Sequence, residues 1–297
     1  MTVNCDKITK NTLRMFVMKI IVTGAKGQLG SDVVARLREI GAHPIEADLP
    51  DLDITDAAAT EKFIGGSGAD GVIHCAAFTN VDVAETEKEL CRKVNAEGTA
   101  NIAAVCGKLG IKMLYTSTDY VFSGEGNGPF ETDSPKIPCN YYGVSKLDGE
   151  IAVKENCEKH FIVRISWVFG ENGKNFVKTM LRLAEERDEI SVVCDQVGSP
   201  TYTKDLAKLL CEMISGEKYG VYHATNEGFC SWAEFAAAIM ESAGKKTRII
   251  PVTSEQYKSV AKRPANSRLS KKSLDDNGFD RLPDWRDALE RFLANIN

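Results

Sequence analysis

A tyrosine and a lysine four residues apart, Tyr142 and Lys146, have the types and spacing needed for acid–base chemistry. Reduction of a ketone needs a proton donor beside a bound hydride donor, and a phenol with its ordinary pKa of about 10 is a weak acid near neutrality. If the segment is helical, both side chains lie on one face. The ammonium of Lys146 could then lower the pKa of the phenol and also hydrogen-bond a cofactor ribose. Such pairs are common on helix surfaces, so the prediction depends on the surrounding sequence.

A glycine-rich turn supplies a place for the cofactor. The β-branched run at 19–23 predicts a buried parallel strand, and a helical pattern follows the turn. Gly24 permits a tight turn, Gly27 lets the backbone approach a pyrophosphate at the helix N-terminus, and Gly30 permits close packing of helix on strand. Strand, turn and helix in this order predict dinucleotide binding. The alternative is a glycine-rich turn without a ligand.

Three further predicted strands end in residues suited to the same site. The runs 44–48, 71–77 and 112–116 lead to Asp48, Ala77 and Thr118 respectively. Asp48 stands about 20 residues after the turn, where a carboxylate would meet the adenosine ribose hydroxyls. Ligands of parallel sheets collect beyond the carboxyl ends of the strands, so we expect these residues to lie together with the glycine turn.

The elements around the tyrosine and lysine are also predicted from local patterns. Asn140 is the expected N-cap of their helix, and the run 160–170 is expected to be one strand. A single long helix is expected from about 85 to 109. His74, inside a predicted strand, is expected to be a packed core histidine and not a catalyst.

Alternating strands and helices with short connections predict an α/β fold, a Rossmann-type doubly wound parallel sheet. We expect an NAD(P)-binding Rossmann domain over 18–170 and mainly a smaller C-terminal substrate-binding lobe over 171–297, with some segments returning to the Rossmann domain. Residues 1–17 match no strand or helix pattern, so a disordered N-terminal extension is expected. Their apolar stretch is too short for a signal peptide, and Lys19 interrupts it.

Composition excludes several classes of protein. A net charge of −5 argues against binding to nucleic acid or to an anionic membrane surface. No apolar run approaches the roughly 18 residues of a membrane helix. The nine cysteines are scattered without a Cys-x-x-Cys pair, so neither a zinc site nor a disulfide framework is expected. Free thiols in a cytoplasmic protein are the expectation.

Taken together, the motifs resemble those of the extended short-chain dehydrogenase/reductases. The motifs that carry this resemblance are Gly24-x-x-Gly27-x-x-Gly30, Ser117-Thr118-Asp119, Tyr142-x-x-x-Lys146 and Ser166-Trp167-Val168-Phe169-Gly170. More narrowly, the chain is similar to the dTDP-4-dehydrorhamnose reductase family in Thr79-Asn80-Val81-Asp82, Asp195-Gln196-x-Gly198-Ser199-Pro200-Thr201 and Arg263-Pro264-x-Asn266-Ser267. The similarity extends from about Met18 to the C-terminus. It implies an NAD(P)H-dependent oxidoreductase that reduces the 4-keto group of dTDP-4-dehydro-L-rhamnose to dTDP-L-rhamnose, a precursor of cell-surface polysaccharides.

The resemblance also implies roles for individual residues. The catalytic set is Thr118, Tyr142 and Lys146, and the substrate would contact Thr118, Asp119 and Trp167. Gly27, Gln28 and Leu29 would hold the pyrophosphate, Asp53 and Ile54 would lie near the adenine, and Ala77, Phe78 and Thr79 would lie along the cofactor. We add Arg263 as the cation for the substrate diphosphate.

Cofactor preference and assembly stay open at this point. Asp48 favours NADH because it would repel a 2′-phosphate, whereas Lys26 could attract that phosphate, so we expect NADPH to be used and NADH to be accepted. Glutamates bridge dimers through magnesium in some relatives; here the shorter Asp32 stands near one such position, so a metal-bridged dimer is not expected and no metal ligand is assigned. Whether magnesium binds stays open, and the protein would be a monomer or a homodimer. The alternatives are another nucleotide-sugar reductase or epimerase, or a regulatory subunit that binds the dinucleotide without turnover.

Overall fold

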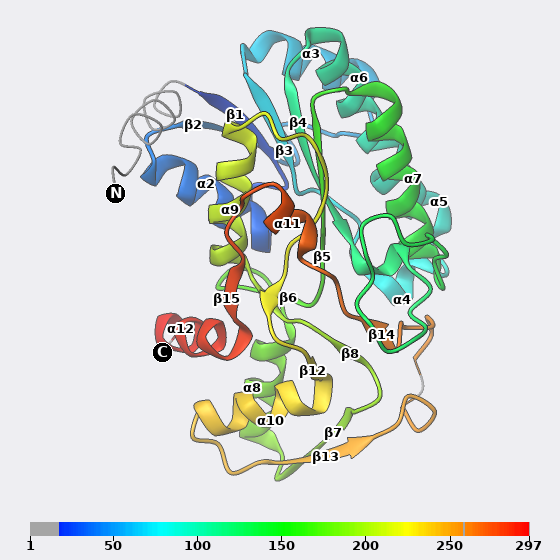
Figure 1. Ribbon diagram of the computed structural model, residues 1–297, viewed down its shortest axis with the longest axis vertical. Coiled ribbons are helices and arrows are strands. Elements are labelled where there is room, and N and C mark those ends of the chain that lie inside the picture. Colours follow the sequence, from blue (N-terminus) through cyan, green and yellow to red (C-terminus); the bar gives the residue numbers. More distant parts are fainter. Residues whose placement is uncertain (1–17, 258, 297) are drawn as a thin grey trace.

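The computed structural model describes residues 18–257 and 259–296. The expectation for residues 1–17 therefore lies outside the described part of the chain. The helices and strands in this part form an upper body built on a large sheet and a lower lobe with small sheets (Figure 1).

The upper body is built on a six-stranded sheet in the order β10-β5-β4-β3-β1-β2, and every neighbouring pair is parallel. The expected α/β fold with a Rossmann-type parallel sheet is thus confirmed. The strands are β1 Lys19–Thr23, β2 His43–Ala47, β3 Gly71–His74, β4 Lys112–Thr118, β5 His160–Ile165 and β10 Gly220–His223. Strand β10 comes from the C-terminal half of the chain.

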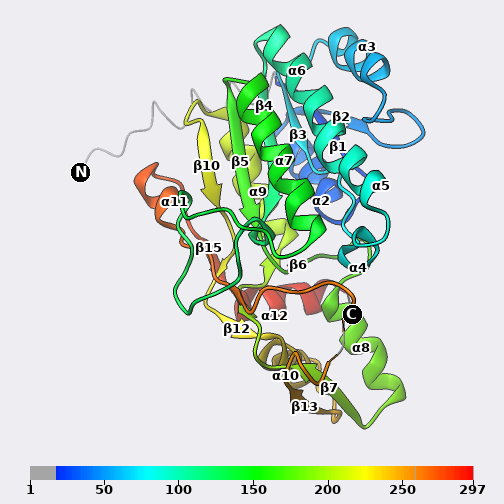
Figure 2. The same ribbon diagram turned by 90° about the vertical axis from the view of Figure 1, so that its right-hand side faces the viewer.

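Helices cover both faces of this sheet because its strands are apolar on both sides. The helices α2 Gln28–Glu39 and α9 Thr203–Ser215 pack on one face, in a core that includes Val22 and Leu210. The other face carries α3 Ala57–Ser67, α6 Thr99–Leu109 and α7 Tyr141–Asn156, and Figure 2 shows α6 and α7 side by side along it.

The lower lobe has its own apolar core, formed largely by α8 Phe176–Glu186, α10 Trp232–Ser242 and α12 Trp285–Ile296. Its small sheets pair β7 Glu189–Val193 with β13 Arg248–Val252, β6 Val168–Phe169 with β9 Thr201–Tyr202, and β11 Asn226–Glu227 with β15 Leu282–Asp284. A three-stranded sheet places β8 Val197–Gly198 between β12 Cys230–Ser231 and β14 Asn266–Ser267.

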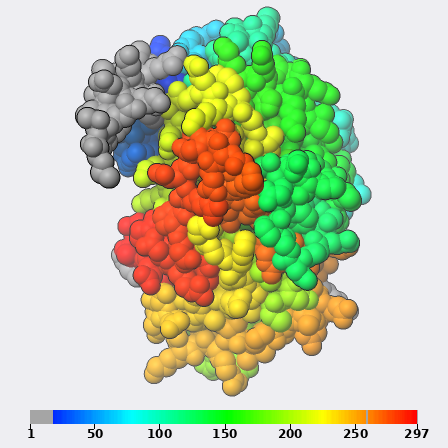
Figure 3. Space-filling view, in the orientation of Figure 1, coloured from blue at the N-terminus to red at the C-terminus, as the bar shows by residue number. Residues whose placement is uncertain are grey.

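Two distant segments meet on the surface between the upper body and the lower lobe. The loop that contains Phe130 pairs with the chain around Leu269, and the N–H of Ser270 donates to the carbonyl of Phe130. Figure 3 shows the green loop lying beside the orange segment that leads into α11 Lys272–Asp276. This contact ties the connection after β4 to the C-terminal part of the chain.

Three expected elements are wrong in detail. The long helix at 85–109 is instead α4 Val81–Ala84, a turn, α5 Lys88–Arg92, a π-helical segment at Lys93–Gly98, and α6. The strand expected at 71–77 ends at His74, after which the small residues form irregular backbone along the cleft described below. The strand expected at 160–170 ends at Ile165, because Trp167 takes a positive φ of 50° and the chain then pairs with β9.

None of the helices in the described ranges has the length and apolar character needed to span a bilayer.

Candidate active site

A cleft of about 1010 Å³ lies beyond the carboxyl ends of the central strands and receives residues from both parts of the molecule. The structure brings most of the predicted site residues into its wall, namely Gly24, Gly27, Gln28, Leu29, Asp48, Asp53, Ile54, Ala77, Thr79, Thr118, Asp119, Tyr142, Lys146 and Trp167. Gly30, Phe78 and Arg263 do not line it.

The glycine turn has the geometry of a pyrophosphate cradle. Gly24 has a φ of 64°, and a Cβ there would come within 2.7 Å of the backbone nitrogen of Ala76. A Cβ on Gly30 would come within 2.0 Å of the carbonyl oxygen of Gly24, so helix α2 can approach the turn only with glycine at this position. Gly27 is the N-cap of α2, and glycine has no side chain with which to cap that end. The first amide groups of the helix are therefore left for an anion.

The carboxylate of Asp48 accepts hydrogen bonds from the backbone at the glycine turn. Its Oδ2 accepts the N–H of Lys26 at 3.0 Å and its Oδ1 accepts the N–H of Leu49 at 3.0 Å. The Nζ of Lys26 donates to the carbonyl of Leu49 at 3.4 Å. The carboxylate thus holds the turn together as well as lining the cleft, and the ammonium of Lys26 lies at the carbonyl of the next residue, Leu49.

Tyr142 is half-buried in the cleft next to Thr118 and Asp119. Its ring meets that of Tyr120 edge to face, with the centroids 5.6 Å apart. Burial is the main cause that raises the pKa of Tyr142, the nearby charge of Asp119 adds to it, and a hydrogen bond with Thr118 opposes both. The phenol therefore stays protonated at neutral pH, which suits a proton donor.

The expectation that Lys146 lowers the pKa of Tyr142 is wrong for this geometry. The Nζ of Lys146 donates to the carbonyl of Thr116 at 2.8 Å and lies 4.1 Å from the centre of the Tyr115 ring. Burial lowers the pKa of Lys146 itself to about 7, and the carboxylate of Glu150 opposes this shift. The lysine thus lines the cleft, and its charge is not among the causes that shift the pKa of Tyr142.

Asp119 has one oxygen engaged and one free. The hydroxyl of Thr118 donates to its Oδ1 at 3.0 Å, and burial raises the pKa of the carboxyl to about 6. Its Oδ2 is buried and makes no hydrogen bond within the described residues. A buried acceptor without a partner is costly, so this oxygen is suited to a ligand hydroxyl.

A buried ion pair holds the helix that carries Tyr142 and Lys146. The guanidinium of Arg164 on β5 donates to both oxygens of Glu150 on α7 at 2.7 Å, and both side chains are at most 1% exposed. The hydroxyl of Ser117 donates to the same carboxylate at 2.6 Å. These contacts fix α7 against the strands next to Thr118. The N-cap expected at Asn140 is confirmed, since its side chain accepts the N–H of Gly143.

Asn95 lies in the π-helical segment and joins three parts of the site. Its side chain accepts the N–H of Phe78 at 2.7 Å and donates to the carbonyl of the same residue at 3.0 Å. It also donates to the hydroxyl of Ser145 on α7 at 3.0 Å. π-Helical turns occur often at functional sites. Asn95 thus fixes the backbone of Phe78, and an asparagine inside a helical pattern was the available signal for this contact.

Two predicted residues lie elsewhere. Arg263 forms a bidentate ion pair with Asp82 at 2.9 and 3.1 Å, half-buried at the segment that crosses from the lower lobe. His74 is buried and bonded to Thr23 and Thr99, which confirms it as a core histidine. Within the described residues no group of three or more His, Cys, Asp or Glu side chains could hold a metal ion.

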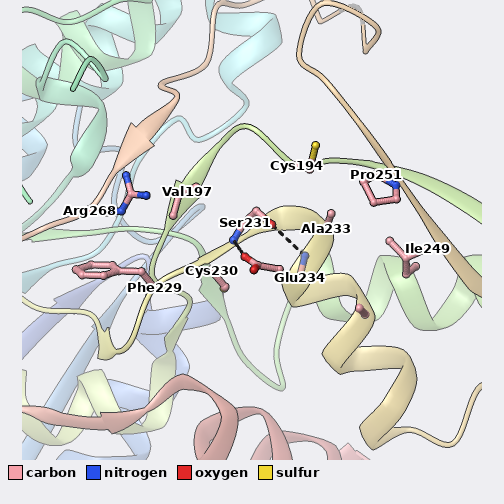
Figure 4. Close-up of a pocket in the computed structure, with 11 residues that line it drawn as sticks. Cys194, Val197, Phe229, Cys230, Ser231, Ala233, Glu234, Ile249, Pro251 and Arg268 are labelled. Carbon is pink, nitrogen blue, oxygen red and sulfur yellow. Dashed lines mark hydrogen bonds between the residues drawn. The ribbon is translucent and has the colours of Figure 1, made fainter. Parts of the chain in front are cut away.

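A second hollow, of about 750 Å³, lies in the lower lobe and contains none of the predicted site residues (Figure 4). It is largely apolar, with Arg268 at one end, the start of α10 in the middle, and Ile249 and Pro251 at the other end. In the main cleft, sequence reasoning missed Lys174 and Trp232. Both come from the lower lobe, and no local pattern links them to the glycine turn.

Comparison with known proteins agrees with this geometry. Residues 18–297 match the family described as "RmlD substrate binding domain". The spore coat polysaccharide biosynthesis protein SpsK of Bacillus subtilis is 42% identical over 93% of this chain and 96% of its own length, and the dTDP-4-dehydrorhamnose reductase of Burkholderia thailandensis is 39% identical over 92% and 97%. The crystal structure of dTDP-4-dehydrorhamnose reductase from Bacillus anthracis in complex with NADP superposes with a TM-score of 0.92 at 42% identity, covering 94% of this chain and 99% of that one.

Proposed function

The chain belongs to the dTDP-4-dehydrorhamnose reductase family, and we propose that it uses NADPH to reduce the 4-keto group of dTDP-4-dehydro-L-rhamnose to dTDP-L-rhamnose. The observation that carries this proposal is the meeting of Thr118, Tyr142 and Lys146 with the glycine turn in one cleft. The product would supply rhamnose for a cell-surface polysaccharide. We place the enzyme in the cytoplasm as a monomer or homodimer.

The cofactor fits the residues present. The uncapped start of α2 and the glycines at 24 and 27 would receive the pyrophosphate, with Gln28 and Leu29 beside it. Asp53 and Ile54 would lie near the adenine, and Ala77 and Thr79 along the rest of the molecule. Lys146 would bond the nicotinamide ribose. When bound, the reduced nicotinamide supplies a hydride for the keto carbon.

Side chains of the protein itself carry out the remaining steps. As the keto oxygen gains negative charge, the hydroxyl of Tyr142 gives it a proton, and the hydroxyl of Thr118 donates a second hydrogen bond. The raised pKa of Tyr142 keeps that proton in place until an alkoxide, a far stronger base, forms beside it. The ketone thus gains a hydride on carbon and a proton on oxygen.

The sugar would occupy the side of the cleft nearest the lower lobe. Asp119 Oδ2, which has no partner among the described residues, would accept from a sugar hydroxyl, and Trp167 would line the ring. Arg263 is proposed for the diphosphate, for which it must leave or share its pair with Asp82. NADH is proposed as a second, weaker cofactor, because Asp48 opposes and Lys26 favours a 2′-phosphate.

The test is turnover with the purified protein. The protein is mixed with NADPH and dTDP-4-dehydro-L-rhamnose, the loss of reduced cofactor is followed by absorbance, and the nucleotide sugar is identified by mass spectrometry and NMR. Formation of dTDP-L-rhamnose in equal amount to NADPH consumed is expected. Binding of NADPH without oxidation would instead favour a regulatory subunit, and oxidation with another nucleotide sugar alone would favour a different reductase.

A further inference from the structure

Two tryptophans stack in the wall of the cleft. The rings of Trp167 and Trp232 have centroids 3.7 Å apart and planes within 13° of each other, and both residues are half-buried and line the cleft. Trp167 follows strand β5 of the upper body, whereas Trp232 is the first residue of α10 in the lower lobe. The stack therefore joins the two parts of the molecule at the ligand-binding surface.

Trp167 does not hold this position by its own backbone preference. Its φ of 50° is rare and unfavourable for a bulky residue, so neighbouring contacts must maintain it. Thr201 supplies two of them: its N–H donates to the carbonyl of Trp167 at 3.1 Å and its hydroxyl donates to that of Ser166 at 2.6 Å. A Cβ on Gly198 would come within 2.9 Å of the indole, so glycine is needed there. Gly198 lies against one part of the Trp167 indole, and the ring of Trp232 packs on the face of that indole.

Trp232 is fixed by the start of its helix. The hydroxyl of Ser231 accepts the N–H of Glu234 at 3.1 Å, and the carboxylate of Glu234 accepts the N–H of Ser231 at 2.7 Å (Figure 4). This reciprocal cap defines where α10 begins. Phe176, at the first position of α8, also packs on Trp232, with centroids 4.6 Å apart.

A polar connection links this aromatic group to the glycine turn. The side-chain amide of Gln28 donates to the carbonyl of Val168, next to Trp167, at 3.1 Å. Its oxygen accepts from Asn175 at 2.9 Å, and Asn175 caps the helix that begins with Phe176. Gln28 and Asn175 thus also support the wall formed by the two tryptophans, from the side of the glycine turn.

We propose that Trp232 is a positioning residue for the sugar, which acts by holding the indole of Trp167 at the angle that the hexose ring needs. This inference rests on the proposed function and adds to it a residue that sequence reasoning did not select. A flat, rigid indole suits the apolar face of a deoxyhexose, and rigidity lowers the entropy lost on binding. Trp232→Phe retains an aromatic ring but reduces the overlap, so Trp167 is held less firmly.

The experiment measures binding and turnover separately. Calorimetry with dTDP-L-rhamnose and with dTDP alone is carried out on the wild type, Trp167→Phe, Trp232→Phe and the double variant. We expect Trp232→Phe to weaken dTDP-L-rhamnose about tenfold and dTDP less than about twofold, with the KM for NADPH unchanged. Because Trp232 acts through Trp167, adding Trp232→Phe to Trp167→Phe should cause little further loss.

Trp285→Phe is the matched control. Trp285 is fully buried in the same lobe and does not line the cleft, so its replacement should lower stability without a loss specific to the sugar. Equal weakening of dTDP and dTDP-L-rhamnose in Trp232→Phe, or additive losses in the double variant, would overturn the positioning role. Wild-type protein that binds dTDP-L-rhamnose but does not turn over would contradict the proposed reaction alone.

Discussion

Lys146 is buried, and this burial determines how the protein responds to pH. Its pKa falls to about 7 in the folded protein, below the ordinary lysine value of 10.5. Between these pH values the unfolded chain binds the proton and the folded chain does not, so this group makes stability rise with pH across the window from about 7 to 10.5. Below pH 7 both states are protonated and the full cost of burying the ammonium remains.

Lys146→Met should remove that dependence. The difference in melting temperature, variant minus wild type, is expected to be greater at pH 6.5 than at pH 9.5, whatever its value at either pH. Thermal unfolding of the protein without cofactor, at matched ionic strength, measures it. A difference that stays constant or grows with pH would show that Lys146 is not held with a lowered pKa. The same variant should bind NADPH more weakly, since the ribose loses its partner.

Asp48 is the residue on which cofactor choice depends most. Asp48→Asn retains an oxygen to accept the N–H of Lys26 and removes the charge that opposes a 2′-phosphate. The ratio of kcat/KM for NADPH to that for NADH should rise by about tenfold, or roughly 1.4 kcal/mol. Steady-state kinetics with both cofactors measures the ratio, and Lys26→Gln should move it the other way. An unchanged ratio in both variants would place the 2′-phosphate away from this turn.

At the scale of elements, close packing of the first helix on its turn makes Gly30 indispensable. Gly30→Ala would bring a Cβ within 2.0 Å of the carbonyl of Gly24, and both groups belong to rigid backbone. We expect loss of NADPH binding by at least about tenfold, measured by fluorescence titration. Gly65→Ala is the control, because a Cβ there meets nothing within 4 Å and alanine favours a helix. Equal affinity of the two variants for NADPH would contradict the role of the glycine turn as the pyrophosphate site.

The pair formed by Glu150 and Arg164 anchors helix α7. Glu150→Gln leaves a fully buried guanidinium without its counter-charge, so the free energy of unfolding should fall by about 3 kcal/mol. Urea denaturation measures the loss. The exposed pair of Glu61 and Lys108 offers a control, because Glu61→Gln should leave stability unchanged within error. If the free energy of unfolding fell as little in Glu150→Gln as in Glu61→Gln, apolar contacts would be what holds α7 in place.

The elements set by local pattern were predictable, and those set by tertiary contact were not. The β-branched run at 19–23, the glycine turn and the cap at Asn140 all follow from short-range chemistry, and the structure has each of them. The strand expected to extend to 170 instead stops at Ile165, since the positive φ of Trp167 depends on contacts from Gly198 and Thr201, more than 30 residues away in sequence. The π-helical segment around Asn95 likewise makes hydrogen bonds to Phe78 and Ser145, which lie 17 and 50 residues away in sequence.

In the candidate site, too, residues in local motifs could be predicted, whereas residues brought in by tertiary contact could not. The residues of the glycine turn and of Tyr142-x-x-x-Lys146 were predicted because each motif is contiguous. Trp232 was missed because its partner Trp167 is 65 residues away (232 minus 167), and a tryptophan at a helix start resembles an ordinary core residue. The direction in which the pKa of Tyr142 shifts could not be predicted either, because the shift depends on burial and on Asp119.

At the scale of the whole molecule, the site exists only where the upper body and the lower lobe meet. The sheet contributes the glycine turn, Thr118 and the helix with Tyr142, while the lower lobe contributes Trp232 and Lys174. Gln28 and Asn175 join the two across the cleft. A ligand that fills both sides of the cleft should therefore stabilise the molecule more than either half of the ligand alone.

The most direct test of the account compares two tyrosines in the same cleft. Single-turnover oxidation of saturating NADPH by dTDP-4-dehydro-L-rhamnose is measured for Tyr142→Phe and for Tyr120→Phe, whose rings are in contact. General acid catalysis contributes about a hundredfold to ten thousandfold, so Tyr142→Phe should slow the step by that factor while binding NADPH normally, and Tyr120→Phe should retain the rate within about threefold. A Tyr142→Phe protein that keeps more than about a tenth of the wild-type rate would contradict Tyr142 as the proton donor.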